Sequence, residues 1–127
     1  KTNLPKNLIF LSASFKTKKK NRREIEDYID KLKEKKEITQ PLKVKTGGST
    51  FKNPKDQTDQ KVWKLIRESV DNQISFGDAK ISNKHCNFFI NSKSASFENM
   101  NNLINYVKKK VKDKTGISLE LELEIIS

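Results

Sequence analysis

The chain has 127 residues, enough for one domain with its own core, or for one domain with part of a neighbour. Lysine and arginine number 27 against 16 acidic residues, so the formal net charge is +11. This charge favours an anionic partner such as a phosphate-bearing small molecule, nucleic acid or an acidic surface, although a lysine-rich proteome would also produce it. The single cysteine, Cys86, excludes an intrachain disulfide and a cysteine-based zinc site.

No apolar run reaches the length of a membrane span, and no signal-peptide pattern opens the sequence. We therefore expect a cytoplasmic protein with no membrane partner. The first residue is lysine, not methionine, so we expect the chain to begin within a longer protein.

The first 40 residues predict a strand and a helix. Residues 8–15 are short, apolar and partly β-prone, which predicts a buried strand. After a basic connection, Asn21 and Glu24 have the spacing of a capping box at a helix start. The helix that follows has an apolar face at i, i+3, i+4 and i+7, formed by Ile25, Tyr28, Ile29 and Leu32.

A segment with several candidate functional residues follows the helix. Residues 42–45 alternate apolar and basic, which predicts a half-buried strand leading into Gly-Gly-Ser-Thr-Phe-Lys-Asn-Pro at 47–54. Paired glycines permit left-handed backbone angles, and Pro54 keeps Asn53 out of the helical region. Such a loop suits a bound anion or a reacting carbon. A tight turn before a strand is the alternative interpretation.

The middle of the chain predicts a second helix from residue 62 to 70, capped by Asp59 and carrying Trp63 as a core or interdomain anchor. A turn at 76–79, a short strand at 79–82 and a buried strand at 86–91 follow. His85 is the only histidine, so we expect a structural or substrate-shaping role and no metal site.

The last third predicts a helix from Ser96, its N-cap, to Gly116, which ends it. A strand at 117–126 then alternates leucine and glutamate. Glu120, Glu122 and Glu124 share one face, which is either a solvated edge or the wall of a site. Taken together, the elements predict an α+β fold with helices packed on a largely antiparallel sheet.

Three blocks of sequence resemble the C-terminal part of the UDP-N-acetylenolpyruvoylglucosamine reductase (MurB) family. They are residues 47–54, Gly-Asp-Ala-Lys-Ile-Ser-Asn-Lys-His-Cys-Asn-Phe at 77–88, and Leu-Glu-Leu-Glu-Leu at 119–123. The resemblance implies that residues 1–40 are the tail of a flavin-binding region and that residues 41–127 are a substrate-binding domain. The flavin domain itself, with the family's catalytic arginine, would lie upstream.

The resemblance also implies a reaction of peptidoglycan synthesis. In this family NADPH reduces FAD, and the flavin passes hydride to the enolpyruvyl double bond of UDP-N-acetylglucosamine enolpyruvate, giving UDP-N-acetylmuramate. Ser49 matches the proton donor, and Glu122 matches a carboxylate that stabilises or protonates the intermediate. Asn53 matches a contact to the substrate's diphosphate region, with Lys52 beside it. No cofactor-binding or metal-binding residue is expected here, so the chain alone should be colourless and inactive.

The sequence departs from the family pattern at Asp78, where glycine is usual, and at Leu121 and Glu124, where proline and a basic residue are common. Glu120 and Glu124 therefore remain alternatives to Glu122. A serine hydroxyl is a weak acid, so Ser49 needs a cation nearby to stabilise its alkoxide. A basic nucleic-acid-binding module and an interaction domain without a site of its own are the competing functions.

Overall fold

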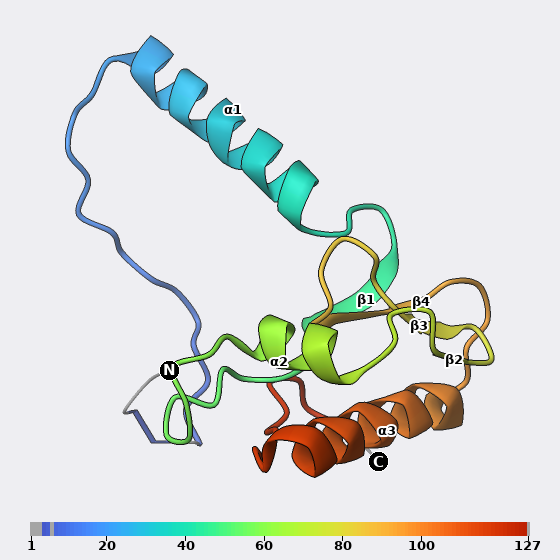
Figure 1. Cartoon of the computed structure of the whole chain (residues 1–127). Helices are drawn as coiled ribbons and strands as arrows, with labels where there is room; N and C mark the ends of the chain where they lie inside the picture. The colour runs from blue at the N-terminus through green and yellow to red at the C-terminus, as the bar shows by residue number, and fades with distance from the viewer. Residues whose placement is uncertain (1–3, 6, 127) are drawn as a thin grey trace.

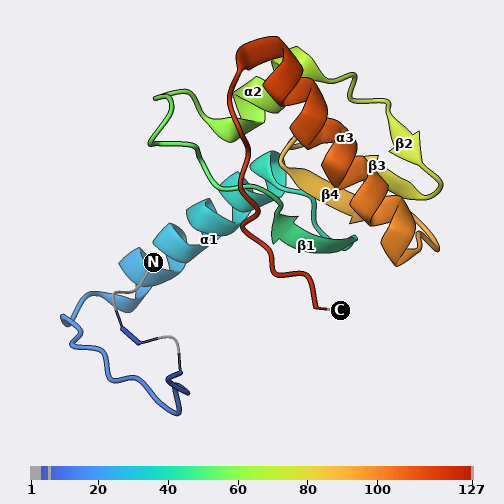
Figure 2. The ribbon, with the colours of Figure 1, turned by 90° about the horizontal axis from the view of Figure 1, so that it is seen from below.

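The computed structural model describes residues 4–5 and 7–126. In chain order its elements are α1 (Arg22–Thr39), β1 (Lys45–Ser49), α2 (Val62–Ser69), β2 (Ser75–Phe76), β3 (Ala79–Ile81), β4 (Phe88–Asn91) and α3 (Phe97–Thr115) (Figure 1). The strands form one antiparallel sheet in the order β1-β4-β3-β2. The helix α3 packs against α2 and against strands β2 and β3 (Figure 2). The predicted α+β fold is confirmed.

A single core lies between the sheet, α2 and α3. Its largest fully buried side chains come from the segment after β1 and from the two helices: Phe51, Leu65, Ile66, Leu103, Val107 and Val111. The ring of Phe51 meets that of Phe89 edge to face, with centroids 5.8 Å apart. The predicted caps of α3 are confirmed, because Ser96 and Asn99 form a capping box and Gly116 is left-handed, with φ 75°.

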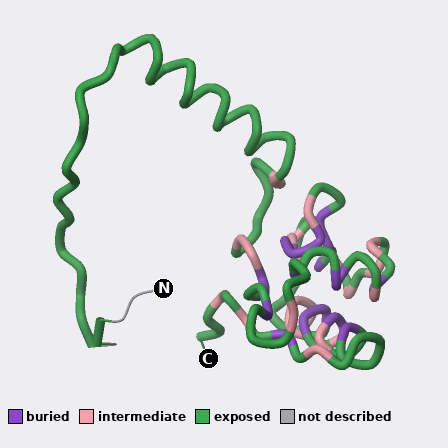
Figure 3. Tube along the Cα trace, turned by 60° about the vertical axis from the view of Figure 1, so that its left-hand side comes forward, coloured by how far each residue is buried: buried purple, intermediate pink, exposed green. Residues whose placement is uncertain are grey.

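The helix α1 stands apart from this core, and none of its residues is buried (Figure 3). Asn21 caps it as predicted, but its side chain accepts from the main-chain N–H of Arg23, and Glu24 completes no capping box. The apolar stripe that includes Tyr28 and Leu32 is exposed. One hydrogen bond joins α1 to the main body: the Lys84 ammonium donates to the Glu37 carbonyl at 2.8 Å.

The buried strand predicted at residues 8–15 is wrong for this chain. These residues have no regular secondary structure, and Phe10 and Leu11 are 71% and 92% exposed. A strand is stabilised by cross-strand neighbours and burial, and not by its own propensity. Among the described residues, no second strand lies beside this segment, so its β-prone residues have no cross-strand partners.

The strands and the cap of α2 also differ from the predictions. The strand expected at 42–45 begins only at Lys45 and includes both glycines, because Lys43 has a left-handed φ of 57°. The pairing of β1 with β4 shifts register between Thr46 and Ser49, where Gly48 has φ 87°. The helix α2 begins at Val62 as predicted, but Asp59 does not cap it, because the N-cap residue is Lys61. Among the described residues, the predicted strand at 117–126 forms only one isolated bridge.

Candidate functional site

The glycine-rich segment and the end of the chain lie side by side. Phe51 forms an antiparallel bridge with Leu121. On either side of that bridge, Lys52 N donates to the Glu120 carbonyl and Glu122 N donates to the Thr50 carbonyl, both at 2.9 Å. Two blocks that are about 70 residues apart in the sequence therefore meet through main-chain hydrogen bonds.

This pairing sets which side chains share a face. Residues directly opposite in an antiparallel pair project to the same side. Lys52 and Glu120 accordingly form an ion pair, with Nζ 3.2 Å from Oε2. Both side chains are largely exposed, so the pair contributes at most about 1 kcal/mol to stability. Glu122 lies opposite Thr50, one residue from the half-buried Ser49.

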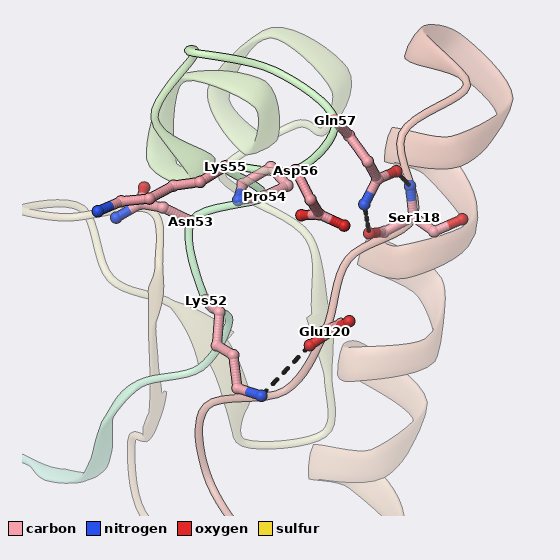
Figure 4. Close-up of a pocket in the computed structure, with 8 residues that line it drawn as sticks. All are labelled: Lys52, Asn53, Pro54, Lys55, Asp56, Gln57, Ser118 and Glu120. Carbon is pink, nitrogen blue, oxygen red and sulfur yellow. Dashed lines mark hydrogen bonds and ion pairs between the residues drawn. The ribbon is translucent and has the colours of Figure 1, made fainter. Parts of the chain in front are cut away.

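A polar cavity of about 260 Å³ opens beside this ion pair (Figure 4). Both predicted substrate-binding residues line it, together with one of the three candidate glutamates: Lys52, Asn53 and Glu120. The rest of its wall is formed by Pro54, Lys55, Asp56, Gln57 and Ser118. Ser49 and Glu122 do not line this cavity, so the structure brings Lys52, Asn53 and Glu120 together and leaves Ser49 and Glu122 outside it.

Asn53 has a structural task that the sequence did not reveal. Its Oδ1 accepts from Val62 N, the first residue of α2, at 3.0 Å. The N-cap residue of that helix, Lys61, makes no side-chain capping bond, so Asn53 caps α2 from nine residues upstream. The acceptor of the Asn53 amide is thus used within the protein. Its NH₂ group has no partner among the residues that the structure describes and is free to donate to a ligand.

Asn87 is a second residue that sequence reasoning missed. The side chain is 3% exposed and makes two hydrogen bonds to the main chain of Phe51, in the centre of the glycine-rich segment. Two signals were available: a polar residue inside a run predicted to be a buried strand, and its place in the 77–88 block. Neither signal indicated its partner.

A second cavity, of about 420 Å³, lies on another part of the surface. It is lined by Ile38, Thr39, Trp63, Arg67, Asn83, Lys84, His85 and Cys86. Trp63 lies in its wall and is 38% exposed, so it is not a core residue of the described chain, whereas Cys86 is buried as a small core residue. His85 Nδ1 accepts from Asn87 N at 3.2 Å, and the imidazole packs edge to face on Phe88. These contacts are those of a structural histidine.

Burial lowers the pKa of His85 below its ordinary value of 6.5, and a main-chain hydrogen bond opposes part of that shift. The unfolded chain therefore takes up this proton at a higher pH than the folded chain. We expect stability to be fully present above pH 6.5 and to fall as the pH drops toward the lower folded-state pKa. Urea midpoints at about pH 7.5 and 5.5, above the range where carboxylates titrate, measure the loss.

The control for this prediction is His85→Gln, which keeps an acceptor for Asn87 N and cannot ionise. Its urea midpoint should change less between the two pH values than that of the wild type. Equal changes in both proteins would show that His85 does not carry the dependence.

The described part of the chain contains no group of three histidine, cysteine, aspartate or glutamate residues that would hold a metal ion. Within the same residues, no helix is long and apolar enough to cross a bilayer.

Comparison with known proteins identifies the family. Residues 40–126 match the family model described as UDP-N-acetylenolpyruvoylglucosamine reductase, C-terminal domain. The chain belongs to this family. The resemblance inferred from the three sequence blocks is thereby confirmed, and the matched residues contain both the glycine-rich segment and the terminal glutamates.

Relatives in this family are longer than the chain. The UDP-N-acetylenolpyruvoylglucosamine reductase of Pelagibacter ubique is 64% identical over 123 residues, which cover 97% of this chain and 41% of the relative. That of Rickettsia bellii is 41% identical over 98% of this chain and 40% of the relative. The crystal structure of MurB from Thermus caldophilus superposes with a TM-score of 0.64 at 29% identity, covering 84% of this chain and 36% of that one. The chain thus spans about two fifths of the curated relatives' length.

Proposed function

We propose that this chain is the substrate-binding C-terminal portion of an FAD-dependent, NADPH-using reductase. The enzyme would convert UDP-N-acetylglucosamine enolpyruvate to UDP-N-acetylmuramate in the cytoplasm. The observation that supports this function best is the pairing of residues 50–52 with residues 120–122, because it joins the two blocks that carry the proposed site. A domain division at residue 40 is part of the proposal, and the exposed apolar face of α1 is consistent with it.

In this proposal, different residues of the chain bind the substrate and transfer the proton. The Lys52 ammonium and the free NH₂ of Asn53 are hydrogen-bond donors at one polar cavity, which suits a diphosphate. Ser49 holds the proton for the substrate carbon, and Lys52 or an upstream arginine stabilises the alkoxide that remains. Glu122 stabilises the intermediate, with Glu120 and Glu124 as the alternatives.

In this proposal, bound FAD supplies the hydride after its reduction by NADPH. The upstream part of the protein would hold both cofactors. Ser49 is only half-buried and Glu122 is exposed, so neither is sealed inside this chain. This arrangement fits a site that another domain completes. The chain alone is then expected to be colourless and inactive.

Ligand titration of the full-length protein that carries this chain tests the function. We expect UDP-N-acetylglucosamine enolpyruvate to bind. Single-stranded RNA, titrated at two salt concentrations, should bind weakly at both. Lys52→Ala should weaken nucleotide-sugar binding by about tenfold, since it removes a charged hydrogen bond. Lys33→Ala removes another exposed, ion-paired lysine, from α1, and is the matched control.

The other outcomes identify the competing functions. RNA binding with a steep salt dependence, without nucleotide-sugar binding, would identify a nucleic-acid-binding module. Binding of neither ligand would leave an interaction domain.

A further inference from the structure

We propose that Asn87 is a positioning residue for the reaction, because its side-chain amide takes the place of a missing strand beside residues 50–52, which lie between Ser49 and Asn53 of the proposed site. The proposal rests on the proposed function. Asn87 lies in the turn before β4 and is 3% exposed.

The amide of Asn87 binds both main-chain groups of one residue. Its Oδ1 accepts from Phe51 N at 3.0 Å, and its Nδ2 donates to the Phe51 carbonyl at 2.9 Å. Both bonds are buried. A carboxamide carries the same donor and acceptor as a peptide group, so it can satisfy a strand edge as a neighbouring strand would.

The backbone of β4 cannot do this itself. The ladder between β1 and β4 ends at the pair of Ser49 and Phe88. Beyond Phe88 the chain turns away, and Phe88 N donates to the carbonyl of His85 within that turn. Phe51 would therefore face no strand on this side. The Asn87 side chain fills the gap, and the Asn87 carbonyl accepts from Thr50 N at 2.8 Å.

The opposite edge of the same segment is held by the end of the chain. Thr50 O accepts from Glu122 N, and Lys52 N donates to Glu120 O. Residues 50–52 are thus clamped between Asn87 on one side and the two glutamates on the other. Ser49 directly precedes this clamp, and Asn53 directly follows it. Removing the amide would free the segment on one side and change the position of Ser49 relative to Glu122.

Asn87→Leu in the full-length, flavin-containing protein tests the inference, because leucine has similar size and no hydrogen-bonding groups. We expect flavin reduction by NADPH to stay near the wild-type rate. Flavin reoxidation by the nucleotide-sugar should slow by about 100-fold, the effect of a displacement of roughly 1 Å at a catalytic group. Hydrogen exchange should accelerate at the Phe51 and Lys52 amides by about tenfold or more.

Val107→Ala is the matched control, since Val107 is fully buried in α3 and touches the core without bonding to residues 50–52. It should lower stability and leave both half-reactions near normal well below its unfolding temperature. Should Asn87→Leu fail to fold, Asn87→Ala removes the amide without adding bulk and gives the same comparison.

Each result decides the question. Reoxidation within about twofold of wild type in the Asn87 variant, or an equal loss in Val107→Ala, overturns the positioning role. Failure of the proposed function is recognised separately, because the wild-type flavin would then not be reoxidised by the nucleotide-sugar at all. In that case the exchange rates of the Phe51 and Lys52 amides still decide whether Asn87 holds the segment.

Discussion

Ser49→Ala in the full-length, flavin-containing protein is expected to leave flavin reduction by NADPH near normal and to slow reoxidation by the nucleotide-sugar by about 10²- to 10⁴-fold. The two half-reactions separate because only the second needs a proton on the substrate carbon. Ser49 stands at the end of β1, half-buried, where the register of β1 and β4 is irregular. Rapid mixing with each substrate alone, followed through the flavin absorbance, measures both rates.

The neighbouring residue supplies a sharp control. Thr50 also carries a hydroxyl, but it is 1% exposed, and its Oγ1 has no hydrogen-bond partner among the described residues. Thr50→Val keeps the shape and removes an unpaired buried polar group, so neither stability nor rate should fall. Equal reoxidation rates in wild type and Ser49→Ala would remove Ser49 from the mechanism. An equal loss in Thr50→Val would indicate disturbed packing instead of a lost proton donor.

Local sequence signals predicted the helices well. Ser96 and Gly116 bound α3 as expected, and the apolar face of that helix is the one that packs into the core. Such signals act over a few residues, so the sequence alone contains all of the information. The same reasoning placed the turn at Gly77, which has φ 55°.

Strands were predicted less well, because their stability depends on distant partners. Residues 8–15 have strand composition and no strand neighbour in the described chain, so they stay exposed. The predicted leucine–glutamate alternation at the end of the chain agrees with the burial, since Leu119 is buried, Leu121 and Leu123 are partly buried, and the three glutamates are exposed. It did not predict that only the bridge at Leu121 would form.

For the site too, local features were predicted from the sequence and long-range contacts were not. The sequence singled out Lys52 and Asn53, and the structure places both at one cavity with Glu120. The sequence could not reveal that Asn53 also caps α2, or that Asn87 binds Phe51 across 36 residues of sequence. Contacts of this length follow from the fold, and no spacing rule predicts them.

Phe51→Ala is expected to destabilise the chain by about 3–5 kcal/mol, the usual cost of removing a buried aromatic side chain. The Phe51 ring is 1% exposed and packs edge to face on Phe89. A typical domain has only about 5–15 kcal/mol of total stability, so this loss takes much of it. Urea unfolding of the 127-residue chain measures the change.

Phe15→Ala is the matched control, because Phe15 is 84% exposed and its removal should cost less than about 0.5 kcal/mol. The location of Phe51 makes the comparison informative beyond stability. Its ring belongs to the core, while its main chain lies between Asn87 and the bridge to Leu121. Loss of the ring should therefore also speed hydrogen exchange at Lys52 and Glu122, whose amides donate across that bridge. If Phe51→Ala lowers the free energy of unfolding no more than Phe15→Ala does, the core does not anchor residues 50–52, and the proposed site must be held by other contacts.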